Sequence, residues 1–141
     1  MLQIIKDSRP SYSQEIINKL DEYSYRSKRY QINFALVLIY CKKDINLAEI
    51  IDVKRRTDRY ISLDKNLCCV VFDCIDSESS QKAALNLQKQ VQQSCLNKDL
   101  FIEVITSMEC ESTSKMTNHL FDMLQKFLYS LGVENKLAAI G

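Results

Sequence analysis

The feature of this sequence that most constrains its fold is the stretch FALVLIYC at residues 34–41, which is almost continuously apolar and rich in strand-forming side chains. A strand with one solvated face alternates polar and apolar residues, whereas a strand covered on both faces is apolar throughout. The stretch therefore predicts a central strand with packed layers on both sides. It is far shorter than the roughly 20 apolar residues needed to cross a bilayer, so we expect no membrane insertion.

Helical and extended patterns alternate around this strand. Apolar residues at helical spacing predict a helix capped by Ser13, after an irregular segment at residues 1–12, and Gly132 is expected to end the last helix. The expected helices are 13–30, 46–57, 77–95 and 114–131, with Asn46 as a cap of the second. The expected strands are 33–41, 59–63, 67–74 and 99–108, with a short edge strand at 136–140. A polar connection, Asp64-Lys65-Asn66, joins two of these strands as a hairpin.

This order, a helix followed by β-α-β-β-α-β-α, predicts an α/β (α+β) sandwich with a central mixed sheet. We find no repeat, linker or low-complexity stretch, so residues 1–141 are expected to form a single domain.

Charge and composition limit the classes of partner. The formal net charge is only +1, so no global field favours nucleic acid or an anionic membrane. Tyr23 and Tyr30 are expected on the buried stripe of the first helix, with Arg26 on a solvated flank. We therefore expect no nucleic-acid binding.

The chain has six cysteines and no pattern typical of an export signal at its start, which predicts free thiols and a cytoplasmic location. Cys68 and Cys69 are adjacent on a predicted strand, so their side chains point to opposite faces and do not readily share a metal. With Cys41 and Cys74, they are interpreted as core residues. Asp76 or Ser77 is expected to cap the following helix, with Asp73 nearby.

Glycine is scarce: the chain has only Gly132 and Gly141. Phosphate-binding loops of the Walker and dinucleotide types need several glycines so that main-chain N–H groups can approach phosphate. Neither loop is present, and no cofactor is expected.

Several motifs, in order, resemble the GGDEF domain, the nucleotidyl-cyclase fold of bacterial diguanylate cyclases. The matching segments are Arg29-Tyr30 with Phe34 and Leu36, RRTD at 55–58, DSESSQKAALNLQKQV at 76–91, FIEVITSMEC at 101–110 and HLFDMLQKFLYSLG at 119–132. The resemblance covers most of the chain and implies a cytoplasmic signal-transduction domain.

The departures from the family pattern imply a non-catalytic member. The signature Gly-Gly-Asp/Glu-Glu-Phe turn would fall at about residues 63–68, where there is no Gly-Gly pair. The first strand ends in Ile-Tyr-Cys-Lys at 39–42 where the family has a metal-binding Asp, and Asp44 is the nearest acid. The segment that carries the guanine-binding residues is also missing. We therefore expect neither enzyme activity nor a metal site, since phosphoryl transfer needs carboxylates to hold Mg²⁺.

Two binding functions from different classes stay open, beside a less favoured enzyme built from Asp73, Asp76, His119 and the thiols. The first is protein–protein interaction through the hairpin at 63–67 and the shortened connection at 42–46, with a homodimer left open. The second is a cyclic di-GMP receptor, because Arg55, Asp58 and Arg59 resemble the family's inhibitory site, where Arg and Asp recognise guanine. The same residues also have a purely structural interpretation, as a local cap or ion pair.

Overall fold

The structure is a computed structural model that describes residues 2–52, 58–73 and 76–140. Its elements are α1 (Leu2–Tyr30), β1 (Phe34–Cys41), α2 (Leu47–Ile50), β2 (Arg59–Asp64), β3 (Leu67–Asp73), α3 (Ser77–Gln92), a short 3₁₀ helix (Asn97–Asp99), β4 (Leu100–Thr106) and α4 (Thr113–Ile140). Within these residues, no helix is long and apolar enough to span a membrane.

The four strands form one sheet in the order β2-β3-β1-β4, with every neighbouring pair antiparallel. The expectation of a mixed sheet was therefore wrong. Strands β1 and β2 run in the same direction, but β3 folds back through the hairpin and lies between them, which leaves no parallel neighbours. This is the split β-α-β arrangement.

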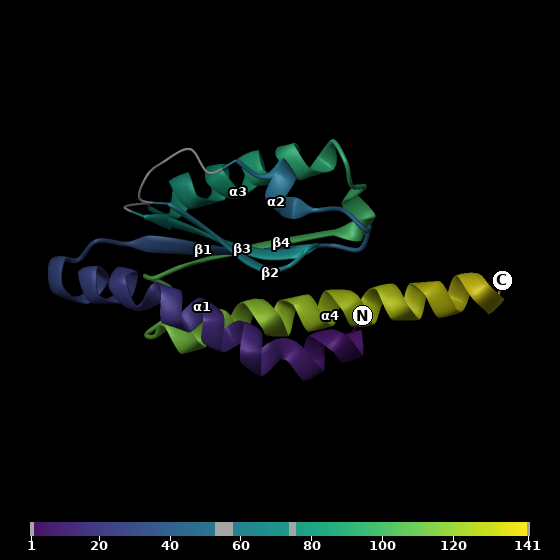
Figure 1. Cartoon of the computed structure of the whole chain (residues 1–141), viewed down its shortest axis with the longest axis horizontal. Helices are drawn as coiled ribbons and strands as arrows, with labels where there is room; N and C mark the ends of the chain where they lie inside the picture. The colour runs from purple at the N-terminus through teal and green to yellow at the C-terminus, as the bar shows by residue number, and fades with distance from the viewer. Residues whose placement is uncertain (1, 53–57, 74–75, 141) are drawn as a thin grey trace.

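Helices cover both faces of the sheet, with α1 and α4 on one face and α2 and α3 on the other (Figure 1). All residues of β1 are buried, which confirms the covered central strand. Leu36, Leu38 and Tyr40 pack toward α1 and α4, whereas Val37 and Ile39 pack toward α3. The α/β sandwich predicted from the sequence is thus the architecture of the chain.

Helix α1 differs from the prediction at its start. Residues 2–12, which were expected to be irregular, are helical, and the helix continues through Pro10 and Ser13. Proline in a helix interior removes one main-chain hydrogen bond, but packing against α4 supports this turn. Ile5 is in the core, and the Arg9 guanidinium pairs with Asp122 and bonds the carbonyl of Asn118.

Two further helix boundaries were predicted wrongly. Helix α4 passes through Gly132 and includes 136–140, which was expected to be an edge strand. The sequence KLAA consists of strong helix formers, and a single glycine weakens a helix without ending it. Helix α2 was expected at 46–57, but it spans Leu47–Ile50, capped by Asn46 as predicted, and residues 51–52 are not helical. Residues 53–57 lie outside the described residues.

Candidate functional site

The tip of the β2–β3 hairpin packs on the connection between β1 and α2. We call residues 42–46 and 63–67 together the hairpin surface. The Cys41 N–H donates to the Asn66 carbonyl (3.0 Å), and the Asn66 side-chain amide donates to the Cys41 carbonyl (2.9 Å). The Leu47 N–H donates to the Lys65 carbonyl (2.9 Å). These bonds join two segments that are distant in sequence into one ordered surface.

Charged side chains of both signs lie on the hairpin surface. The Lys65 ammonium is 3.4 Å from the Asp44 carboxylate, and both side chains are largely exposed. Asp64 accepts a hydrogen bond from the Lys65 N–H (2.7 Å). Burial, followed by the negative charge of Asp64, raises the pKa of Tyr12 on α1, which also reaches this end of the sheet. Exposed pairs of this kind add little stability, but they place charges of both signs next to each other on the surface.

The end of β1 holds a disulfide between Cys41 and Cys95, which follows α3. The expectation that all cysteines are free was therefore wrong for this pair. The two residues lie far apart in sequence, and only the packing of α3 against the sheet brings them together. Cys41 lies within the stretch 39–42, where the resemblance to GGDEF domains would put a metal-binding carboxylate.

The other described cysteines are free. Cys68 and Cys69 are buried on opposite faces of the sheet, as predicted from their adjacency on a strand. Burial raises the pKa of the Cys68 thiol to about 12 and that of Cys69 well above its ordinary value. Both are therefore inert core residues. Cys110 is free and half-buried, and Cys74 lies outside the described residues.

The three residues of the predicted ligand site differ in their surroundings. Arg55 lies outside the described residues. Asp58 is only 8% exposed, and its carboxylate accepts a hydrogen bond from the Asp73 N–H (2.9 Å). Arg59 begins β2 with a half-exposed side chain, and its guanidinium lies 3.9 Å from the Glu22 carboxylate on α1. Asp58 thus has a structural contact, and Arg59 is half-exposed beside Glu22 and Tyr23.

An ion pair between α1 and the end of β3 was missed by the sequence analysis. Arg26 was expected on a solvated flank, but its guanidinium is 2.7 Å from the carboxylate of Asp73, which is 2% exposed. The guanidinium also lies over the ring of Tyr23, 5.0 Å from its centroid. Tyr23 is buried as expected, whereas Tyr30 is exposed. An acid at the end of an otherwise apolar strand was the one signal that could have suggested a buried partner.

The acids and the histidine of the less favoured enzyme interpretation have separate environments. Asp73 pairs with Arg26, Asp76 caps α3 by accepting from the Ser79 N–H (2.7 Å), and His119 is exposed on α4. In the part of the chain that the structure describes, no three His, Cys, Asp or Glu side chains are placed to hold a metal ion.

Comparisons with known proteins give no family for this chain. No protein-family model matches it, and no curated protein matches it either. The resemblance to GGDEF domains therefore rests on the sequence motifs and on the order in which they occur.

Proposed function

We propose that the chain is a non-catalytic, GGDEF-like signalling domain that acts by protein–protein interaction through the hairpin surface. The observation that carries the proposal is the set of hydrogen bonds that joins the hairpin tip to the β1–α2 connection. Lys42, Lys43, Asp44 and Lys65 are all exposed on the resulting surface.

Preordering favours binding because a partner does not have to immobilise these segments. Ordering of loops and side chains is among the main costs of association. Charges of both signs then determine which partner fits, since complementary charges give specificity and speed encounter more than they raise affinity.

The non-catalytic part of the proposal is supported by what occupies the end of β1. Cys41 ends the strand with its sulfur bonded to Cys95, so this position has no carboxylate to offer a metal. Of the described acids near this strand end, Asp44 and Asp64 contact Lys65 on the outer surface, and Asp99 accepts the Lys42 N–H at its main-chain carbonyl.

The test is affinity purification of partners from cells that naturally express the chain. The variant D64K/K65E reverses two charges of the hairpin surface and keeps the net charge. The matched control is E78K/K82E, which reverses an exposed pair on α3 that is separated by 3.5 Å. We expect partner recovery to fall with D64K/K65E alone. Unchanged recovery with D64K/K65E would count against this surface.

The second candidate is a cyclic di-GMP receptor that uses Arg55, Asp58 and Arg59. The half-exposed guanidinium of Arg59 favours it, since such a group can fork onto phosphate or guanine. The burial of Asp58 counts against it, because a ligand has little access to the carboxylate, which already accepts a hydrogen bond from the Asp73 N–H. Isothermal titration calorimetry with cyclic di-GMP tests this candidate, with Arg55→Ala as the control. Saturable heat that the substitution abolishes would support the receptor.

A further inference from the structure

Strand β4 lies at the edge of the sheet, and the register of its pairing with β1 shows which main-chain groups are open. The Lys42 N–H donates to the Asp99 carbonyl, and the Ser107 N–H donates to the Phe34 carbonyl, at the two ends of this ladder. In an antiparallel pair, hydrogen-bonded residues alternate with residues whose main-chain groups point away from the partner. The N–H and C=O groups of the even-numbered residues of β4 therefore point away from β1.

Local contacts occupy main-chain groups at both ends of this open edge. At one end, Thr106 donates its N–H to the Glu109 carboxylate (3.5 Å) and accepts at its carbonyl from the Glu109 N–H (3.0 Å). At the other end, the Leu100 N–H donates to the Asn97 carbonyl. The described residues offer no partner to either main-chain group of Ile102 or Val104. We call residues 102–104 the β4 window.

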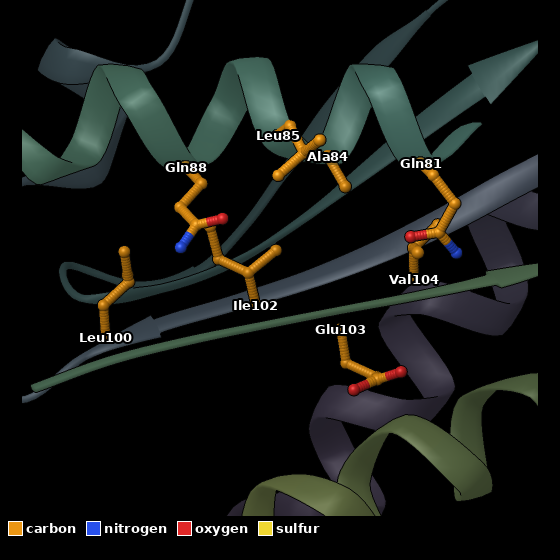
Figure 2. A pocket seen from close by; sticks show the side chains of 8 residues that line it. All are labelled: Gln81, Ala84, Leu85, Gln88, Leu100, Ile102, Glu103 and Val104. Carbon is orange, nitrogen blue, oxygen red and sulfur yellow. The ribbon is translucent and has the colours of Figure 1, made fainter. Parts of the chain in front are cut away.

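A hollow of about 260 Å³ lies between α3 and the β4 window. Figure 2 shows Ile102 and Val104 pointing toward α3, with Gln81 and Gln88 reaching down from the helix and Leu85 beside them. Leu85 is 54% exposed, although it borders the hollow beside the apolar side chains of Ile102 and Val104. The hollow is smaller than the roughly 300–1,000 Å³ of most small-molecule sites, but it adjoins unpaired strand edge. An added strand would bond to the unpaired main-chain groups of this edge and place every second side chain in the hollow.

The charge of the β4 window determines which strand fits. Glu103 lies at its centre and points to the other face of the sheet (Figure 2). In a dimer, the symmetric register that pairs Ile102 of each copy with Val104 of the other places the two Glu103 carboxylates directly opposite each other. Like charges in that position are destabilising, whereas an opposite charge is favourable. A charge at the centre of an edge strand also discourages edge-to-edge pairing between copies.

We propose that the β4 window binds an extended segment of another protein as a fifth, antiparallel strand. The segment has small apolar residues opposite Ile102 and Val104 and a Lys or Arg opposite Glu103. Its two apolar residues exchange four main-chain hydrogen bonds with Ile102 and Val104 and cover the exposed face of Leu85. This surface is separate from the hairpin surface and does not depend on it.

The test uses a fluorescein-labelled peptide, Thr-Val-Lys-Val-Thr, with blocked ends, and measures fluorescence anisotropy against the whole chain. We expect saturable binding with a Kd below about 1 mM. N-methylation of both valines removes two donors and weakens binding by about tenfold or more. Replacement of the peptide Lys by Glu also weakens binding to the wild type. Binding of that Glu peptide is then restored by Glu103→Lys.

Two variants of the protein test whether the peptide binds at the β4 window. Val104→Pro removes an N–H that points away from β1, a position where an edge strand tolerates proline, and Leu85→Glu alters the wall on α3. Both should abolish binding, whereas Tyr129→Glu, at an exposed apolar residue of α4, should not. If Val104→Pro fails to fold, amide hydrogen exchange of the wild type replaces it. We expect the amides of Ile102 and Val104 to exchange faster than that of Glu103, which faces β1, and the peptide to slow their exchange.

The proposal is overturned by any of three results: no binding at about 5 mM peptide, equal binding of the N-methylated peptide, or a concentration-dependent dimer abolished by Val104→Pro. The variant D64K/K65E leaves the β4 window intact and should bind the peptide normally. If the peptide binds but D64K/K65E does not change partner recovery, the result supports the β4 window as a binding site. The same result counts against the hairpin surface as the site of partner binding.

Discussion

The ion pair between Arg26 and Asp73 gives a sharp prediction about stability. The perturbation is Arg26→Met, which keeps an apolar stem over Tyr23 and removes the charge. The Asp73 carboxylate is 2% exposed, and its only described charged partner is the Arg26 guanidinium, 2.7 Å away. Without this partner, an almost fully buried carboxylate is left unpaired.

The magnitude follows from burial rather than from distance. Breaking a buried pair costs about 3–5 kcal/mol, and because Arg26 is itself 26% exposed, we expect about 3 kcal/mol. The exposed pair Lys115–Glu111 has a similar separation of 2.9 Å, but its side chains are solvated, and Lys115→Met should cost at most about 0.5 kcal/mol.

The assay is urea unfolding followed by circular dichroism. With a slope of about 1–3 kcal/mol/M for a chain of this size, the midpoint of Arg26→Met should fall by roughly 1–3 M. The double variant R26M/D73L should recover much of the loss, because no buried charge is left alone. A cost for Arg26→Met below about 1 kcal/mol, or equal to that of Lys115→Met, would refute this reasoning.

Three further predictions concern covalent and titratable groups. Cys41 and Cys95 are 54 residues apart, so replacing both with Ser should lower the unfolding free energy by about 4 kcal/mol; equal thermal unfolding with and without reductant would contradict this. Burial raises the pKa of Cys68 to about 12, so the unfolding free energy should fall as pH rises from about 9 toward 12, and it should fall less in Cys68→Ala. Native Cys68 should also resist alkylation at about pH 8. Hydrogen bonds from Ser79 lower the pKa of Asp76. The stability that this cap provides is therefore present above the ordinary carboxyl pKa and is lost as pH falls through the lower pKa of the folded state. In acid unfolding followed by circular dichroism, the loss of stability on acidification should be smaller for Asp76→Ala than for the wild type.

The sheet and its coverage could be predicted because their signals are local. The apolar run that forms β1, the hairpin connection at Asp64 and the caps Asn46 and Asp76 each depend on residues close in sequence. No local sequence pattern indicates the antiparallel strand order, because that order depends on where β3 inserts relative to β1 and β2. Helix α1 continues past Pro10 for a similar reason: its first turns pack against α4, which lies more than 100 residues later.

The candidate sites were harder to predict than the fold. The contact of Asp58 with Asp73 and the disulfide of Cys41 with Cys95 join segments that only the folded chain brings together. The open groups of Ile102 and Val104 depend on hydrogen-bond alternation along β1, which sequence patterns do not encode. The tip of the hairpin surface was predictable, but its bonds to the β1–α2 connection were not.

The most direct test of the central claim is crosslinking mass spectrometry with an amine-reactive reagent in cells that naturally express the chain. We expect partner crosslinks concentrated on Lys42, Lys43 and Lys65. The exposed lysines Lys82 and Lys115 serve as internal controls away from the hairpin surface. Crosslinks concentrated on the control lysines, or no crosslinked partner at all, would contradict an interaction domain that works through this surface.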